Sequence, residues 1–226
     1  MISVIIPVLN ERQSIRRCIG EVLSEAATSE IIVCDGGSTD GSPDIVEEFR
    51  DRGVILVRTR KGRGTQMNAG ASTASSDILL FLHADTRLEG GWHDAVIQAL
   101  DDPAVAGGAF SLCIDNTEKQ YRLIESWVKC RCRFFTLPYG DQAIFMKRNI
   151  FERIGRYRDI PLMEDVDIAE RMKSAGRIVI LGKRAVTDAR RWEKEGWLHT
   201  SLRNQLIRWL YRLGVDPHKL AGIYYR

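Results

Sequence analysis

The chain lacks several features that would assign it to a class at once. No run approaches the roughly 18 apolar residues of a membrane-spanning helix, and there is no CxxC pair, internal repeat or low-complexity segment. Five cysteines are an odd number for a disulfide framework, so we expect free thiols in a reducing compartment. The formal net charge is only +3, without a concentrated basic stripe, so we expect no nucleic-acid partner.

The remaining composition is that of an ordinary globular protein. The 226 residues are 44% apolar and 28% charged, which fits one folded domain over residues 1–226. The first residues, MISVIIPVLNE, are apolar over too short a stretch for a signal peptide and lack a leading basic region. We therefore expect a cytoplasmic domain that begins with a buried strand.

Short apolar runs alternate with helical patterns along the first part of the chain, which predicts a parallel sheet with right-handed crossovers. We expect an α/β fold with a mostly parallel central sheet flanked by helices and a helical C-terminal tail. The expected strands occupy residues 2–9, 30–35, 54–57, 77–82, 105–113, 143–146 and 178–181. The expected later helices occupy residues 116–135, 164–174 and 197–213.

Polar residues follow three of these strands. Asn10 and Glu11 follow the first, the segment DGGSTDGS begins at Asp35 after the second, and His83 and Asp85 follow the fourth. In an open α/β sheet, ligands bind beyond the carboxyl ends of the strands. The convergence of three strand ends therefore predicts a ligand site at this edge, although Asn10 could instead cap the next helix.

Each of these segments also has a purely structural interpretation. Asp35 could accept a hydrogen bond from a nucleotide base, or its loop could satisfy its own backbone. Asp85 could bind Mg²⁺ or Mn²⁺, which prefer oxygen ligands, or it could be a turn residue. His83 shares a face with Asp85 if the strand extends that far. The loop is not GxGxxG, which disfavours a dehydrogenase.

Two later segments carry charged groups that suit a nucleotide ligand. Lys61, Arg63 and Asn68 lie in KGRGTQMNAG and could clamp a diphosphate or form a solvated loop. Glu164 and Asp165 precede a helical stretch, where the helix dipole favours acids. A carboxylate there would serve as a general base only within reach of an acceptor hydroxyl.

The ordered set of segments resembles glycosyltransferase family 2, an inverting group with the GT-A fold, over roughly residues 2–182. The segments that carry this resemblance are VIIPVLNE, DGGSTDGS, KGRGTQMNAGA, ILLFLHADT, GDQAIFMKR and MEDVDIAERMKSAG. The resemblance implies a Rossmann-like GT-A sheet. It also implies a nucleotide-binding half at residues 1–104, an acceptor and catalytic half at 105–182, and a helical tail at 183–226.

The resemblance assigns roles to matching positions. Asp165 corresponds to the acid of the ED motif, the proposed catalytic base, and Glu164 beside it is the second catalytic candidate. Asp85 corresponds to the last acid of the DxD motif, which binds a divalent Mn²⁺ or Mg²⁺ ion, with His83 as a second candidate ligand. Asp141 in GDQ would face the sugar or acceptor. The full set of residues expected to bind the donor is Pro7, Asn10, Glu11, Asp35, Gly37, Ser38, Lys61, Arg63, Asn68 and Asp141.

One position departs from the family pattern, because His83 stands where the family usually has Asp, so the motif is HAD. The HAD motif together with ARRWEKEGWL is similar to a bacterial subgroup labelled for arsenosugar biosynthesis. The tail also resembles the QxxRW motif through Gln205, Arg208 and Trp209, for which a structural or acceptor-side role is expected. The basic aromatic tail could pack on the domain or lie on the inner face of a membrane.

These observations predict transfer of a sugar from a nucleoside-diphosphate sugar, a UDP-sugar first, to an acceptor hydroxyl on a small molecule or lipid. A sugar nucleotidyltransferase and a non-catalytic nucleotide-sugar binding protein are the alternatives. The sequence does not identify the sugar, the acceptor, the linkage or the oligomeric state.

Overall fold

The computed structural model describes residues 1–25 and 29–224. The strands are β1 Ile2–Val8, β2 Glu30–Asp35, β3 Val54–Arg58, β4 Ile78–Phe81, β5 Thr86–Leu88, β6 Val105–Ile114, β7 Ile144–Lys147 and β8 Arg177–Thr187. The α-helices are α1 Ile15–Glu25, α2 Ser42–Glu47, α3 Arg63–Thr73, α4 Trp92–Asp101, α5 Lys119–Phe135, α6 Arg148–Arg153, α7 Glu164–Ala175, α8 Arg190–Glu195, α9 Trp197–Arg212 and α10 Pro217–Tyr224. Short 3₁₀ turns lie at Arg50–Arg52 and Gly140–Gln142.

The described strands form one sheet of eight in the order β3-β2-β1-β4-β7-β6-β8-β5. The pairs β3/β2, β2/β1, β1/β4 and β6/β8 are parallel, and the other three pairs are antiparallel. The predicted α/β fold with a mostly parallel sheet is therefore confirmed. Because β1, β2 and β4 are parallel neighbours, their carboxyl ends meet at one edge, as the sequence pattern predicted.

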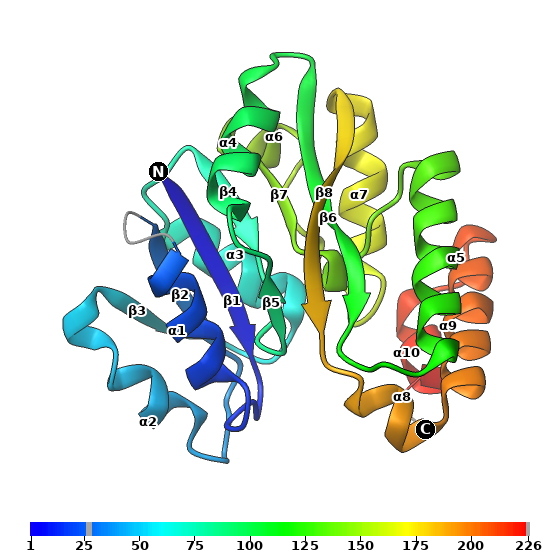
Figure 1. Ribbon diagram of the computed structural model, residues 1–226, viewed down its shortest axis with the longest axis horizontal. Coiled ribbons are helices and arrows are strands. Elements are labelled where there is room, and N and C mark those ends of the chain that lie inside the picture. Colours follow the sequence, from blue (N-terminus) through cyan, green and yellow to red (C-terminus); the bar gives the residue numbers. More distant parts are fainter. Residues whose placement is uncertain (26–28, 225–226) are drawn as a thin grey trace.

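Helices cover both faces of the sheet, so its strands are buried on both sides. Alternate residues of β1 show this: Val4 and Ile6 pack in one cluster with α1, α2 and α4, whereas Ile5 packs in another with α3, α6 and α7. A third group, α5, α8, α9 and α10, lies beyond β6 and β8 (Figure 1). No described helix is long and apolar enough to cross a membrane.

The last strand is longer than the sequence pattern predicted. The predicted strand at 178–181 begins at Arg177 and continues to Thr187, so the boundary at residue 182 falls inside β8. The polar stretch Gly182–Arg184 hides this continuation, because β8 is half exposed there and re-enters the core at Ala185. A register shift between Phe110 and Ser111 of β6 accommodates the change. The pattern also missed β5 and α4.

Helix α3 lies very close to the sheet at Gly70. A Cβ atom added there would lie 2.4 Å from Ile5 Cγ2 and 2.9 Å from Cys34 Sγ. Both atoms belong to residues that are fully buried in adjacent strands. This close approach fixes the start of α3, and hence Arg63, relative to β1 and β2.

We expect Gly70→Ala to destabilise the protein by about 1–3 kcal/mol, because the added methyl group overpacks the contact between α3 and the sheet. Gly20→Ala in α1 is the matched control, because a Cβ there would meet nothing within 4 Å. That substitution should instead stabilise the helix by about 0.5–1 kcal/mol. Urea unfolding of both variants measures the difference, and equal effects would contradict this description of the packing.

Candidate active site

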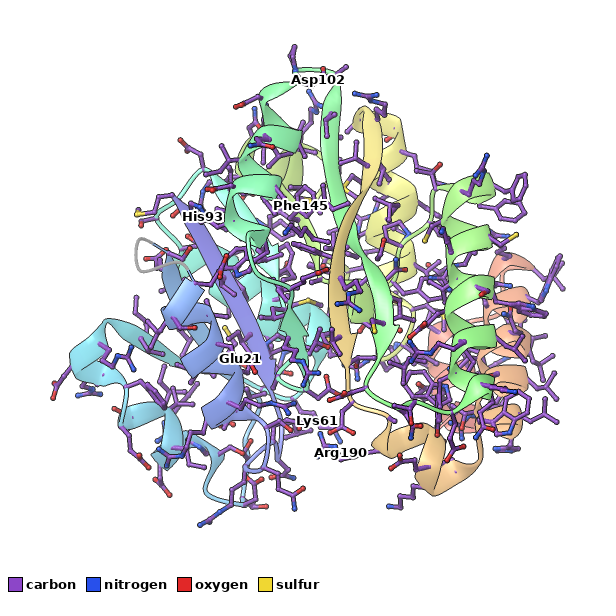
Figure 2. All side chains as sticks on the ribbon, viewed as in Figure 1. Glu21, Lys61, His93, Asp102, Phe145 and Arg190 are labelled. Carbon is purple, nitrogen blue, oxygen red and sulfur yellow. The ribbon has the colours of Figure 1, made fainter. Side chains whose placement is uncertain are left out.

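The carboxyl ends of β1 and β4 face a cavity of about 700 Å³. Six of the predicted site residues line it, namely Pro7, Glu11, Lys61, Arg63, His83 and Asp85. A neighbouring cavity of about 760 Å³ shares Glu11, Arg63 and Asp85 with the first. Lys61 and Arg190 lie at this end of the molecule, and Asp102 lies at the opposite end (Figure 2). Residues far apart in the sequence therefore meet at the predicted edge of the sheet.

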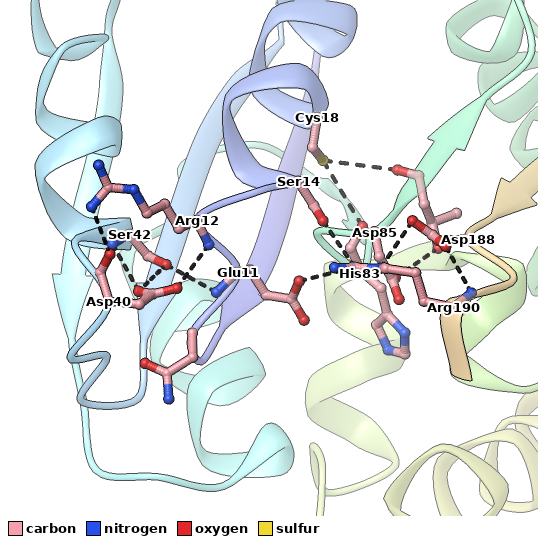
Figure 3. A network of polar contacts seen from close by, with 12 residues as sticks. Glu11, Arg12, Ser14, Cys18, Asp40, Ser42, His83, Asp85, Asp188 and Arg190 are labelled. Carbon is pink, nitrogen blue, oxygen red and sulfur yellow. Dashed lines mark hydrogen bonds and ion pairs between the residues drawn. The ribbon is translucent and has the colours of Figure 1, made fainter. Parts of the chain in front are cut away.

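Glu11 is held by Arg190, the first residue of α8, from a distant part of the sequence. The Arg190 guanidinium lies 3.4 Å from the Glu11 carboxylate and donates to Ser14 Oγ at 2.9 Å. Its Nε lies 2.9 Å from Asp188 (Figure 3). Burial raises the pKa of Glu11, and repulsion from Asp85 raises it further, whereas Arg190 opposes both effects. The sequence pattern missed Arg190 and Asp188, because 179 positions separate Arg190 from Glu11.

His83 and Asp85 reach the cavity from a turn rather than from a strand. Strand β4 ends at Phe81, so the predicted strand alternation does not extend to these residues. Instead, the Thr86 N–H donates to the His83 carbonyl at 3.1 Å, and both side chains line the same cavity. Burial lowers the pKa of His83 to about 4, with a contribution from Arg63. The imidazole is therefore neutral at pH 7, as metal ligation requires.

Asp165 lies at the start of α7, next to the turn that carries Asp141. The Asp165 carboxylate accepts the Gly140 N–H at 2.9 Å and the Val166 N–H at 2.8 Å. A Cβ added to Gly140 would lie 2.9 Å from His83 Nε2, so His83 and Asp165 flank this glycine closely. Two backbone N–H groups thus fix the Asp165 carboxylate, and each of its oxygens keeps a further lone pair.

Asp141 also lies close to this group of acids. Its Oδ1 is buried and has no hydrogen-bond partner among the described residues. Burial raises the pKa of Asp141 to about 6, and the charges of Asp165 and Asp85 add to this rise, while Arg131 opposes it. The structure therefore places Asp141 within electrostatic reach of both Asp85 and Asp165.

Glu164 is buried behind Arg63. Its side chain is 5% exposed, and its carboxylate lies 3.7 Å from the Arg63 guanidinium. Burial raises the pKa of Glu164 to about 7, repulsion from Asp165 adds to the rise, and Arg63 opposes it. Glu164 lines neither of the two cavities. Its position suits a residue that orients Arg63 rather than one that contacts a ligand.

In the loop after β2, the Asp35 carboxylate accepts hydrogen bonds from backbone N–H groups of the same loop. The Asp35 carboxylate accepts the N–H groups of Gly37 and Ser38, both at 3.1 Å. Gly37 has φ of 93°, a conformation that glycine adopts without strain. Asp35 is 3% exposed, and none of these three residues lines either cavity. The loop therefore satisfies its own backbone, as the structural alternative predicted. Recognition of a nucleotide base by Asp35 stays a prediction.

Asn10 joins the first and second strand ends. Its amide oxygen accepts the Thr39 N–H at 2.9 Å, and its own N–H donates to Ser38 Oγ at 2.8 Å. Helix α1 begins at Ile15, so the interpretation of Asn10 as a helix cap was wrong. The residue bridges two loops with φ of 58° and lines the second cavity.

Asn68 also lies away from both cavities. Its side chain donates to the Tyr157 carbonyl at 2.8 Å and accepts the Tyr157 N–H at 3.0 Å. It therefore fastens α3 to the segment after α6. That segment brings Asp159, which pairs with Arg60 at 2.5 Å and lines the cavity beside Lys61.

The tail motif has two different environments. Arg208 donates to the Tyr139 hydroxyl at 3.1 Å and so contacts the body of the protein, and it also hydrogen bonds to Gln205 on the same helix. Trp209 is 59% exposed. Helix α9 packs through Ile207, which is fully buried, and leaves other apolar side chains in solvent. The structural role expected for Gln205 and Arg208 is consistent with these contacts.

The residues around Asp85 fit a divalent cation that shares ligands with a phosphate group. No three His, Cys, Asp or Glu side chains of the described residues converge as a preformed metal site. Mg²⁺ and related ions are usually held by one or two carboxylates together with substrate phosphates and water. Asp85, with neutral His83 beside it and Glu11 facing it, supplies such a partial set.

Comparison with known proteins decides the family. The model of the family described as Glycosyl transferase family 2 matches residues 3–158, which is more than half of the chain. The chain belongs to glycosyltransferase family 2. The predicted resemblance is confirmed at this level, and the arsenosugar subgroup gains no support from the comparisons.

Two curated relatives are longer than the part that this chain matches. It is 28% identical over 197 residues to the glycosyltransferase AglE of Haloferax volcanii, covering 83% of this chain and 62% of the relative. It is 36% identical over 179 residues to a PGL/p-HBAD biosynthesis glycosyltransferase of Mycobacterium bovis, covering 70% and 63%. The chain thus spans less than two thirds of the length of these relatives.

Solved structures confirm the GT-A fold. Residues 1–349 of S. aureus TarS superpose with a TM-score of 0.66 at 16% identity, covering 82% of this chain and 60% of that one. The mannosyltransferase PcManGT of Pyrobaculum calidifontis, in complex with GDP-Man and Mn²⁺, gives a TM-score of 0.62 at 19% identity, covering 82% and 56%. At these identities the likeness concerns the fold.

The buried Glu164 predicts a specific dependence of stability on pH. Its pKa is raised from 4.5 to about 7 in the folded protein. Between these values the folded state binds more protons than the unfolded state, so the free energy of unfolding falls as pH rises. Glu164→Gln removes this titration. Between about pH 5 and about pH 8 we therefore expect the free energy of unfolding of the variant to fall by about 1–3 kcal/mol less than that of the wild type.

Urea unfolding at several pH values measures this effect. Glu170→Gln is the matched control, because Glu170 lies on the same helix with a side chain that is 44% exposed. The control should keep the slope of the wild type. A wild-type slope in Glu164→Gln would contradict the assignment of a buried, protonatable carboxyl to this position.

Proposed function

We propose that this chain transfers a sugar from a nucleoside-diphosphate sugar, a UDP-sugar first, to an acceptor hydroxyl with inversion of configuration. One observation carries the proposal: Asp85, the basic pair Lys61 and Arg63, and Glu11 line one cavity, and His83 of that cavity lies close to Gly140, which Asp165 also flanks. Family membership supports the reaction class. This chain spans less than two thirds of the length of these relatives, and the activity is therefore a proposal.

The donor diphosphate is proposed to lie between Asp85 and the basic loop before α3. Lys61 and Arg63 offer N–H donors to phosphate oxygens, and Glu164 keeps the Arg63 guanidinium in place. A Mg²⁺ or Mn²⁺ ion held by Asp85, with His83 as the second ligand, would neutralise the charge that develops on the leaving diphosphate. The solved TarS and PcManGT complexes, with UDP-GlcNAc and with GDP-Man and Mn²⁺, motivate the donor panel below.

The chemical step requires a base, and Asp165 suits this role. Its carboxylate is fixed by the Gly140 and Val166 N–H groups, so it is oriented before the acceptor binds. Asp165 takes the proton of the acceptor hydroxyl, whose oxygen bonds to the anomeric carbon as the bond to the diphosphate oxygen breaks. The products are the glycosylated acceptor and a nucleoside diphosphate. Membrane contact through α9, a cytoplasmic location and the arsenosugar lead on the acceptor stay predictions.

A donor panel tests the proposal. The protein is incubated with UDP-, GDP- and dTDP-sugars in Mn²⁺, Mg²⁺ or EDTA, and released nucleoside diphosphate is measured together with calorimetric donor binding. We expect metal-dependent release from one donor and a loss of about 10²–10⁴-fold in Asp165→Asn, since a general base contributes that much. Asp85→Ala should weaken donor binding in the presence of metal.

The control is Asp94→Asn, because Asp94 is exposed on α4 and lines neither cavity. It should behave as the wild type. Release of inorganic diphosphate from a nucleoside triphosphate and a sugar phosphate would favour a nucleotidyltransferase instead. Donor binding that never leads to release, even to water, would favour a binding protein. No binding of any donor would overturn the proposal.

A further inference from the structure

An apolar groove lies between α5 and α9, away from the two polar cavities. These helices are neighbours along the side of the molecule beyond β6 and β8 (Figure 1). The groove has a cavity volume of about 320 Å³. Helix α5 contributes Leu123 and Trp127, which are four residues apart, and α9 contributes Leu198 and Leu202 at the same spacing. Each pair therefore forms a stripe on one face of its helix.

These stripes are exposed although they are apolar. Leu123 and Trp127 are 61% and 68% exposed, and Leu198 and Leu202 are 53% and 60% exposed. Contiguous exposed apolar patches of this kind mark binding surfaces more often than ordinary protein surface. Trp192 and Trp197 add two indole rings to the lining.

Three residues that line the groove carry oxygen atoms that are not satisfied within the described part of the protein. Asp141 Oδ1, Ser201 Oγ and Asn204 Oδ1 are buried and have no hydrogen-bond partner among the described residues. All three residues line the groove. A buried polar atom without a partner is unfavourable relative to a paired one, because it has lost its hydrogen bonds to water. Because these atoms are oxygens that accept hydrogen bonds, a ligand with O–H donors would satisfy them.

The cations of the groove are already engaged, which disfavours an anionic ligand. Arg131 donates to the Leu137 carbonyl at 3.1 Å and to Gln142 at 2.8 Å, and it stacks 3.5 Å from the centre of the Tyr139 ring. Arg208 hydrogen bonds to Tyr139 and Gln205. The hydrogen-bonding preference of the groove is therefore for hydroxyl groups rather than for phosphate or carboxylate.

Asp141 connects the groove with the candidate active site. The preceding residue, Gly140, donates its N–H to Asp165 at 2.9 Å. The chain thus passes directly from the lining of the groove to a contact of the proposed catalytic base. A molecule whose body lies between α5 and α9 and whose head reaches Asp141 would present that head to Asp165.

We propose that the α5/α9 groove binds the acceptor, and that this acceptor is a neutral amphipathic molecule with an apolar chain or ring and a hydroxyl-bearing head. The apolar body lies against the leucine and tryptophan stripes, and the hydroxyl groups bond to Asp141, Ser201 and Asn204. The proposal rests on the proposed sugar transfer for the role of the ligand. Binding itself requires no donor, so it is tested separately.

Calorimetric titration with n-octyl β-D-glucoside below its micellar concentration tests the groove directly. Methyl β-D-glucoside has the same sugar head without the octyl chain, so it tests the contribution of the apolar body. The ligand n-octyl sulfate has the same chain with an anionic head, so it tests the preference for hydroxyl groups. We expect the octyl glucoside to bind at least about tenfold more tightly than either, as burial of an alkyl chain predicts. Equal binding of all three would overturn the proposal.

Two aspartate substitutions on one helix locate the binding. Leu202→Asp puts a charge into the groove, whereas Leu206→Asp puts the same charge on α9 outside the groove lining. Both leucines are more than half exposed, at 60% and 54%, so neither substitution removes core packing. We expect Leu202→Asp to weaken octyl glucoside binding by about tenfold or more and Leu206→Asp to leave it within about twofold. Equal loss in both variants would overturn the proposal.

Sedimentation with phosphatidylcholine vesicles separates the two sources of such an acceptor. Vesicle binding that Leu202→Asp abolishes and Leu206→Asp keeps would support the groove with an acceptor drawn from a bilayer. Octyl glucoside binding without vesicle binding would support it with an acceptor taken from solution. If both variants lose vesicle binding equally, the membrane contacts α9 outside the groove, and the proposal is overturned. If light scattering shows a dimer that Leu202→Asp dissociates, a second copy of the chain covers this face, and the proposal is also overturned.

Failure of this inference is distinguishable from failure of the proposed function. If the donor panel shows metal-dependent release but octyl glucoside does not bind, the groove assignment is wrong and the transfer stands. If octyl glucoside binds as expected but no donor does, the transfer is wrong and the groove remains a ligand site of another kind. If both bind, octyl glucoside should accelerate release of nucleoside diphosphate in the wild type and not in Leu202→Asp.

Discussion

Repulsion between carboxylates at one edge of the sheet is the constraint around which the rest of the structure is arranged. Glu11, Asp85 and Asp165 are carried there by different strands and loops, and the rise in the pKa of Glu11 shows that burial and Asp85 both disfavour its charged form. Gathering like charges in a poorly solvated place costs free energy unless cations or N–H groups face them. The protein supplies these compensating groups from three distant segments.

Each compensating group also defines the shape of the site. Arg63 at the start of α3 faces Glu164, and Gly70 sets the distance between that helix and the sheet. Arg190 ties Glu11 to the end of β8, while the Gly140 N–H holds Asp165. At Asp85, a cation shared with a diphosphate would add positive charge to the site. Ligand binding and the relief of repulsion are thus one process in this account.

The sequence predicted the strand ends because buried parallel strands appear as short apolar runs, and the polar residues after them stand out. It predicted Glu11 and Asp85 at one site for that reason, and it predicted Arg63 separately, as a basic group between glycines. It could not predict that Asp35 bonds to its own loop, because a carboxylate beside two glycines suits a ligand equally well. Nor could spacing reveal Arg190, whose partner lies on the first loop, or a groove formed by two separate helices.

Binding of Mn²⁺ in the presence and absence of UDP shows whether a diphosphate completes a metal site at Asp85. If Asp85 and His83 supply only part of a ligand set, the diphosphate must supply the rest. Electron paramagnetic resonance should then show that saturating UDP tightens Mn²⁺ binding by about tenfold or more, and that Asp85→Ala removes this gain. Mn²⁺ binding of the same strength with and without UDP, or a gain that persists in Asp85→Ala, would contradict the account.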